Sequence, residues 1–318
     1  MEPVVNVVLP VFAIILSGFL AGRVGVMGAP STDALNRFVY YFALPVLLGF
    51  SMARVDVSEI FDLPFIAAHL GGCAITFVIG VAVSKTLFRN DLAQSSLFAM
   101  VSMFANTGYM GIPLAIVAFG PEAALPAAIA TVFQTIVFIA IAEVMIAAGR
   151  HSGGGSLTRV YLGSVWALLK SPLFIACALG MGWSLTGIKL PVPVDTYGTV
   201  LGAAAGPGAL FALGLFLVGK PISEGMGEVS VMVVLKLIVH PLIAWFLADQ
   251  VFAIRDDWFV VLVLMAALPT GASVFVLAQQ QGVYIRRTST ATLLSTILAV
   301  FTVAGFFSLP WVSASLAP

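Results

Sequence analysis

Two interrupted apolar segments, one in each half of the chain, most constrain what this sequence can fold into. The first interruption runs from Asn106 to Pro113 and the second from Leu268 to Ser273, each within a stretch otherwise apolar enough to cross a bilayer. Lipid cannot satisfy the backbone N–H and C=O groups that Pro, Gly and small polar residues free there, so these groups must line a cavity or meet a ligand. Two such breaks at matching places in two halves indicate the binding site of a transporter.

Composition indicates a membrane protein. The 318 residues are 61% hydrophobic and 9% charged, which lies outside the range of soluble globular domains. Fourteen basic and fourteen acidic residues balance each other, so the sequence offers no basic surface for nucleic acid. Cys73 and Cys177 lie within apolar segments, which argues against a disulfide framework or a metal site. The fold class that we expect is therefore all-α and polytopic, with the lipid bilayer as its surroundings.

Ten apolar segments are long enough to span a bilayer, with the interrupted ones counted as the fourth and the ninth. Their predicted ranges are 4–22, 34–53, 64–87, 93–119, 123–148, 164–186, 197–219, 229–250, 257–281 and 289–312.

Basic residues in alternate loops predict the orientation. One set of loops holds ten of them: Arg23, Arg37, Lys85, Arg89, Arg150, Arg159, Lys170, Lys220, Arg286 and Arg287. The other set holds three, Arg54, Lys189 and Arg255, among several acidic residues. Since positively charged loops remain in the cytoplasm, we expect a multi-pass protein of the cell inner membrane with both termini on the outer, periplasmic side.

The two halves of the chain match at a shift of 162 residues. Gly18 then falls on Gly180, and Pro45 falls on Pro207. We therefore predict two repeats, residues 1–150 and 151–318, of five helices each. Because five is an odd number, the second repeat enters the membrane from the opposite face, and such inverted repeats are typical of alternating-access transporters.

Three segments carry a family resemblance. These segments resemble the second, fourth and ninth helices of the auxin efflux carrier family: Leu35-Asn36-Arg37-Phe38-Val39 followed by Phe42-Ala43-Leu44-Pro45, Asn106-Thr107 with Gly111-Ile112-Pro113, and Leu268-Pro269-Thr270-Gly271. This family belongs to the bile-acid/sodium-symporter-like superfamily and includes the plant PIN-formed auxin exporters. The resemblance implies a scaffold of helices 1, 2, 6 and 7, a moving transport domain of helices 3–5 and 8–10, and helices 4 and 9 that cross at their breaks. It also implies a small organic anion as substrate, either auxin-like or a dicarboxylate such as malate or malonate, and a homodimer through the scaffold. Ser273 departs from the family pattern, since many members carry Asn there.

The predicted substrate-binding residues surround the two breaks and the scaffold proline that faces them. They are Asn106, Thr107, Gly108, Gly111, Pro113, Pro269, Thr270, Gly271, Ser273 and Pro45. Asn106 either donates its amide to a carboxylate or merely caps the broken helix. The prolines remove backbone hydrogen bonds and hold the breaks open, and the half-helix N-termini that follow favour an anion.

Ion or proton coupling has five candidates within the spans: Glu143, Lys236, His240, Gln134 and Thr131. Glu143 and Lys236 lie about two turns from the cytoplasmic ends of their helices, where they could form a pair, bind a proton or reach the interface. Gln134 and Thr131 could contribute oxygens to a Na⁺ site, although Ser and Thr in membrane helices usually bond to nearby backbone.

The sequence therefore predicts a secondary transporter for a small organic anion, working by alternating access with an elevator-like transport domain, and not an enzyme. A channel-like pore for small solutes remains the alternative, because broken helices also line pores. We expect no bound cofactor or metal, and the coupling ion remains open among H⁺, Na⁺ and none. H⁺ coupling or no coupling is favoured over Na⁺, because no carboxylate lies at the depth of the breaks to offset a metal ion.

Overall fold

The computed structural model describes residues 8–54, 62–150, 166, 169–170, 172–219, 225–254 and 257–316. The predicted starts of the first and sixth spans, at residues 4 and 164, lie outside these ranges, and so do the loop residues Arg159, Lys220 and Arg255. The predicted boundary between the two repeats, after residue 150, coincides with the end of the described range 62–150.

Helices form nearly all of the described chain. In order they are α1 (Leu9–Arg23), α2 (Ala29–Phe38), η2 (Val39–Ala43), α3 (Leu44–Ala53), α5 (Leu63–Leu87), α6 (Leu92–Met103), η3 (Thr107–Gly111), α7 (Ile112–Phe119), η4 (Pro121–Ala123), α8 (Ala124–Arg150), α10 (Pro172–Ser184), α11 (Val192–Ala203), α12 (Ala205–Leu217), α13 (Met226–Val234), η5 (Leu235–Val239), α14 (His240–Phe246), η6 (Leu247–Val251), α15 (Asp257–Ala267), α16 (Ala272–Gln281), α17 (Ile285–Phe307) and α18 (Pro310–Ser313).

Several of these helices are long and apolar enough to cross a membrane. Six qualify within the described residues: Pro30–Ala53, Leu63–Leu87, Pro121–Gly149, Val192–Leu217, Met226–Val251 and Ile285–Phe307. Five shorter apolar helices accompany them: Leu9–Arg23, Leu92–Met103, Thr107–Phe119, Pro172–Ser184 and Asp257–Ala267. The prediction of an all-α, polytopic membrane protein is thus confirmed.

Prolines within the membrane helices explain where these helices widen. Each of the π-helical turns η2, η3 and η5 ends two residues before a proline, namely Pro45, Pro113 and Pro241. A proline ring lacks an N–H and clashes with the carbonyl one turn earlier. The wider π turn relieves this clash, so these helices continue through their prolines instead of ending there.

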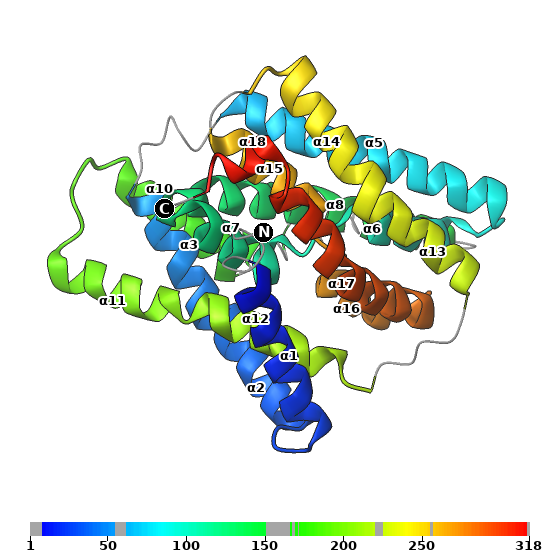
Figure 1. Ribbon diagram of the computed structural model, residues 1–318, viewed down its shortest axis with the longest axis horizontal. Coiled ribbons are helices and arrows are strands. Elements are labelled where there is room, and N and C mark those ends of the chain that lie inside the picture. Colours follow the sequence, from blue (N-terminus) through cyan, green and yellow to red (C-terminus); the bar gives the residue numbers. More distant parts are fainter. Residues whose placement is uncertain are drawn as a thin grey trace.

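The helices form two groups, which meet where α12 packs on η3 and α3 packs on α8. In the first group, α1 packs on α12 and α10 packs on α3, with α11 also against α3. In the second group, α5 packs on α6 and α14, α6 on α8, and α13 on α17. Figure 1 shows α1, α2 and α12 together at the bottom of the view and α5, α13 and α14 at the upper right.

Glycines allow the closest contacts of the first group. A Cβ on Gly18 of α1 would lie 2.1 Å from the carbonyl oxygen of Phe211 on α12. A Cβ on Gly180 of α10 would lie 2.0 Å from the carbonyl oxygen of Gly49 on α3. Any side chain at either position would therefore force the paired backbones apart.

The two broken helices cross and pair through their backbones. After α6 ends at Met103 and α15 ends at Ala267, Ala105 and Thr270 form an isolated antiparallel β-bridge. The Asn106 N–H donates to the Pro269 carbonyl at 2.8 Å, and the Gly271 N–H donates to the Phe104 carbonyl at 2.9 Å. We call Phe104–Asn106 together with Pro269–Gly271 the crossover.

The first break lies earlier than the sequence predicted. Residues 104–106 are non-helical, whereas Gly108 to Pro113, expected to be unwound, belong to η3 and α7. The prediction failed because the π turn absorbs both Gly111 and Pro113 without breaking the helix. The second break, at Leu268–Gly271, lies within the predicted Leu268–Ser273, and Ser273 already belongs to α16.

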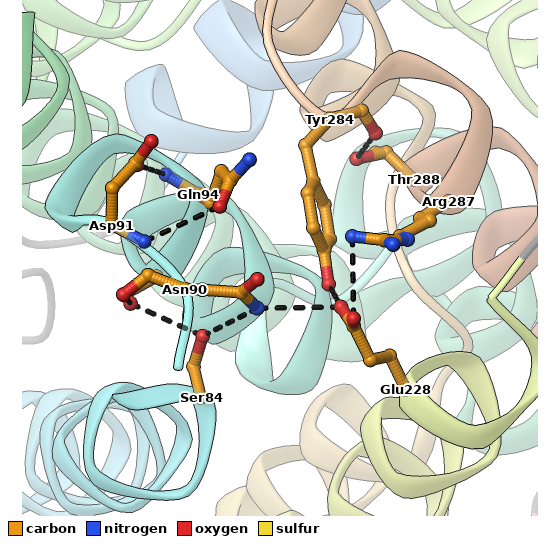
Figure 2. Close-up of polar contacts among 9 residues, drawn as sticks. Ser84, Asn90, Asp91, Gln94, Glu228, Tyr284, Arg287 and Thr288 are labelled. Atoms are coloured by element: carbon orange, nitrogen blue, oxygen red, sulfur yellow. Dashed lines mark hydrogen bonds and ion pairs between the residues drawn. The ribbon is translucent and has the colours of Figure 1, made fainter. Parts of the chain in front are cut away.

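A polar network ties the ends of the second group together (Figure 2). The carboxylate of Glu228, in the first turn of α13, accepts from the Tyr284 hydroxyl and from Asn90 Nδ2, the latter at 3.3 Å. Arg287 on α17 forms an ion pair with the same carboxylate at 3.2 Å. Because Asn90 belongs to the α5–α6 turn, the network joins helices from both halves of the chain.

Candidate binding cavity at the crossover

A cavity of about 560 Å³ extends from the crossover to one end of the helices. Its walls come from both groups of helices. The first group contributes Asn36, Arg37, Tyr40, Tyr41, Leu44, Leu48, Leu173, Phe174, Ala212, Leu213 and Phe216. The crossover and the second group contribute the remaining wall, chiefly from residues 104–109, 131–143 and 271–280.

Half of the predicted binding residues line this cavity. These are Asn106, Thr107, Gly108, Gly271 and Ser273. The other five, Gly111, Pro113, Pro269, Thr270 and Pro45, are not part of its wall. Pro45 is buried within α3, between the lining residues Leu44 and Leu48.

Asn106 is the most distinctive group in the wall. Its side chain is only 4% exposed, and its Nδ2 has no hydrogen-bond partner among the described residues. An unpaired amide donor is costly to bury, and Asn106 lines the cavity, so a ligand that brings an acceptor to this side chain would relieve the cost. Its side chain makes no capping bond to the helix that follows, which favours the ligand-binding interpretation over the capping one.

Two helix N-termini begin at the cavity wall. The helix that starts at Thr107 and the helix that starts at Ala272 both place their first two residues in the lining. The first N–H groups of a helix lack intrahelical partners and form the positive end of its dipole. This geometry suits an anion such as a carboxylate.

The other crossover residues hold the backbone in shape. The Thr270 hydroxyl donates to the Val101 carbonyl at 2.8 Å, and the Thr270 N–H donates to Ser295 Oγ at 3.1 Å. Pro269 offers its carbonyl to Asn106. A Cβ on Gly111 would lie 2.7 Å from Leu268 Cδ1 and 2.8 Å from Met265 Sδ, so a larger residue there would displace these two side chains of the second broken helix.

The five coupling candidates separate into two places. Glu143 and Thr131, both on α8, line the cavity, and the Thr131 hydroxyl donates to the Ala127 carbonyl of its own helix. Gln134, Lys236 and His240 are fully buried away from the cavity.

Lys236 does not reach the interface as its position in the sequence suggested. Its side chain is 0% exposed, and its Nζ donates to the Ala266 carbonyl at 2.7 Å and lies 3.2 Å from His240 Nδ1. These two contacts hold the amine inside the protein. Glu143 instead lines the cavity, so the two residues do not form the expected couple.

Sequence reasoning missed the polar residues at the outer part of the cavity. Asn36, Arg37 and Tyr40 come from α2 and η2, and Gln280 comes from the end of α16. By sequence, Arg37 counts among the basic residues that set the orientation and lies in the family-like segment Leu35–Val39, but it is not among the predicted binding residues. Its position in that segment is the signal that could have identified it.

Comparisons with known proteins identify relatives that are named as transporters or carriers. A family model described as "Membrane transport protein" matches residues 3–307. The "Putative malonate transporter" of Rhizobium meliloti (strain 1021) is 32% identical over 97% of this chain and 96% of its own length. The "Uncharacterized transporter YfdV" of Escherichia coli (strain K12) is 25% identical over 91% and 92%, and "Auxin efflux carrier component 5" of Arabidopsis thaliana is 25% identical over 87% of each chain. These names imply a transport protein and not an enzyme.

Proposed function

The chain belongs to the membrane transport protein family that includes the auxin efflux carriers, and we propose that it is a secondary carrier for small organic anions, above all dicarboxylates. As a family member with several apolar membrane-length helices, it is an integral, multi-pass membrane protein with a small-molecule substrate. The carrier type, its substrate and its mechanism are the content of the proposal.

The observation that carries the proposal is the unpartnered amide of Asn106. Asn106 lines the cavity, and the N-termini of two helices line the same wall. Together they offer a carboxylate one strong donor and two positive dipole ends without the desolvation of a charged side chain. A neutral solute would leave the dipole ends uncompensated, and a cation would be repelled by them.

Arg37 favours an anion with a second carboxylate. It lies on the cavity wall contributed by α2 and is exposed at its side chain. An arginine fork binds carboxylates in bidentate fashion. We therefore propose that one carboxylate sits at Asn106 and that the charge of Arg37, farther out on the cavity wall, favours anions that carry a second carboxylate. The malonate named for one relative has two carboxylates, and an auxin-like anion would use the Asn106 end alone.

Ten membrane crossings in two inverted repeats, residues 1–150 and 151–318, complete the proposed architecture. The glycine contacts of the first group support it, because Gly18 and Phe211 correspond to Gly180 and Gly49 at the shift of 162 residues, with the partners exchanged. Two copies of one unit, related by a pseudo-two-fold axis, produce such an exchange.

Alternating access would move the second group of helices against the first. We assign α1, α2–α3, α10 and α11–α12 to a scaffold and the remaining helices to an elevator-like transport domain. The cavity supports this assignment, since its wall is shared between the two groups. The Glu228 network supports it as well, because it ties α13 to the α5–α6 turn and to α17.

The cavity would open to the cytoplasm in this conformation. Its outer residues, Arg37, Glu143 and Gln280, lie at helix ends that the positive-inside rule assigns to that side. With this orientation the protein lies in the cell inner membrane with both termini periplasmic. We also propose a homodimer through the scaffold helices, which chemical cross-linking in membranes would detect.

A panel of carboxylic acids tests the substrate class. We expect malonate, malate and succinate to raise the midpoint of thermal unfolding of the purified protein in detergent, because a ligand that binds only the folded state stabilises it. Indole-3-acetate should stabilise less, and matched amines such as 1,3-diaminopropane should have no effect. Stabilisation by the amines and not by the acids would contradict the proposal.

A further inference from the structure

Behind the crossover lies a buried cluster of five polar side chains. His69 and Cys73 come from α5, Gln134 from α8, Lys236 from η5 and His240 from α14. All five side chains are at most 1% exposed. Starting from Lys236, Nζ lies 3.2 Å from His240 Nδ1, and His240 Nε2 lies 3.7 Å from Cys73 Sγ. Cys73 Sγ lies 4.0 Å from His69 Nε2 and donates to Gln134 Oε1 at 3.8 Å.

This buried cluster contacts both broken helices. Lys236 Nζ donates to the carbonyl of Ala266, in the last turn of α15. Gln134 Nε2 donates to the carbonyl of Ala105 at 3.0 Å, and Ala105 also lines the cavity. The peptide of Ala105 therefore separates the buried cluster from the cavity, directly beside Asn106.

The carbonyl end of α15 is where a carrier of this design would hold a coupling cation. The C-terminal ends of half-helices and their freed carbonyls coordinate Na⁺ in other transporters. Here the amine of Lys236 donates a hydrogen bond to the Ala266 carbonyl, which would otherwise be a free ligand. A metal ion at this point would meet one amine and two imidazoles, and the described cluster offers it no carboxylate. Amine and imidazole nitrogens are poor ligands for Na⁺, which prefers oxygen.

The protonation of the buried cluster depends on its surroundings. Three titratable side chains face Lys236: His240 from the following turn, and His69 and Cys73 from α5. Helix α15 contributes a backbone carbonyl. The described parts of α6, α13 and α17 nearest to η5 contribute apolar and hydroxyl side chains. The nearest carboxylate along the same helix, Glu228, is paired with Arg287. A positive charge buried without a counter-charge is unfavourable, so an anion in the cavity would stabilise it.

We propose that the buried cluster is the carrier's proton-coupling site, and that it binds one proton when an organic anion binds in the cavity. The proton comes from water and adds to the amine nitrogen of Lys236, with His240 Nδ1 as the neighbouring acceptor that shares it. Because linkage is reciprocal, the bound proton strengthens anion binding by the same factor. The proton and the anion then cross together within the transport domain, and Na⁺ is not required. This inference rests on the proposed carriage of organic anions.

Calorimetry of the full-length protein measures this coupling. Malonate is titrated at constant pH into the purified protein in two buffers that differ in ionisation enthalpy, and the difference in heat gives the protons taken up. We expect uptake of up to about one proton per malonate between about pH 6 and 8, because burial disfavours the charged amine until the anion binds. Replacing sodium by choline should change nothing. Malonate binding without proton uptake across this range, or binding that requires Na⁺, would overturn the inference.

Variants separate the coupling site from the binding site. Lys236→Met should bind malonate about tenfold more weakly, with no proton uptake and no dependence on pH. Lys85→Met, which changes an exposed lysine at the end of α5, should behave like the wild type in every respect. Since Lys236→Met could fail to fold, His240→Gln serves as a second variant and should reduce proton uptake by at least half. Unchanged uptake in either folded variant contradicts the assignment. If malonate, succinate and indole-3-acetate all fail to bind the wild type, the proposed function fails, and this inference fails with it.

Discussion

The two broken helices meet in one crossover but satisfy their polar groups differently. In the second, Thr270 forms hydrogen bonds through both its hydroxyl and its N–H. Ser273, in the first turn of α16, is exposed and lines the cavity. In the first, Asn106 is buried with an amide that lacks a partner. Paired backbones thus do not imply paired roles. On the proposed function, we infer that the first break supplies the ligand for the substrate and that the second supplies the framework that holds it.

Removing the amide from the first break should have the largest effect. We expect Asn106→Ala to weaken malonate binding by about a hundredfold, because a hydrogen bond to a charged carboxylate is lost. Its unfolding midpoint without ligand should equal or exceed that of the wild type, since the variant no longer buries an unpaired donor. Calorimetry and thermal unfolding in detergent measure both quantities. Wild-type affinity in this variant would remove the distinction between the two breaks.

The matching change in the second break should affect stability instead. Thr270→Val keeps the shape of the side chain but leaves the Val101 carbonyl without its donor. We expect a loss of about 1–3 kcal/mol in the free energy of unfolding. Malonate affinity should fall much less than in Asn106→Ala when it is measured well below the unfolding midpoint. A stable Thr270→Val protein with binding abolished would reverse the roles given to the two breaks.

Arg37 sharpens the comparison at the outer part of the cavity. Arg37→Gln should weaken binding of malonate and succinate by about tenfold, because the second carboxylate loses the attraction of the guanidinium charge. Binding of a monocarboxylate such as indole-3-acetate, which has no second carboxylate, should change by less than about twofold. Competition binding with both classes of acid measures the difference. Equal losses for both classes would contradict a role for Arg37 in favouring the second carboxylate.

Ser273 should give the smallest effect. Its hydroxyl is exposed, so Ser273→Ala should change malonate affinity by about threefold or less. Ser273→Asn adds to the second break the amide that the first break already has, and it should strengthen binding or shift the preferred length of the dicarboxylate. A Ser273→Ala variant as defective as Asn106→Ala would show that both breaks contribute equally to the substrate site.

Much of the fold could be predicted from the sequence, because the bilayer imposes simple rules. Apolar length gave the helices, and the Pro and Gly residues within two of them marked the breaks. The exact position of the first break could not be predicted. Gly108, Gly111 and Pro113 look like helix breakers, but a π turn accommodates them, and the chain leaves the helix instead at Phe104.

The candidate site was harder to predict because it depends on contacts between distant segments. Asn106 could be identified from its place beside a break. For Lys236 the sequence left an ion pair, a proton site and a position at the interface open, and only the structure shows that the Ala266 carbonyl and His240 hold it inside. His69 and Cys73 gave no signal, since they are isolated residues on an apolar helix and gain meaning only from α8 and α14 packed beside them.

Counterflow in proteoliposomes tests the central claim most directly. Vesicles that contain the purified protein are loaded with unlabelled malonate and diluted into a trace of radiolabelled malonate. A carrier that alternates access through Asn106 should accumulate label transiently above its external concentration, with saturable dependence on internal malonate, and Asn106→Ala should not. Linear flux without accumulation, as through a pore, or equal counterflow in the Asn106→Ala variant would contradict the account.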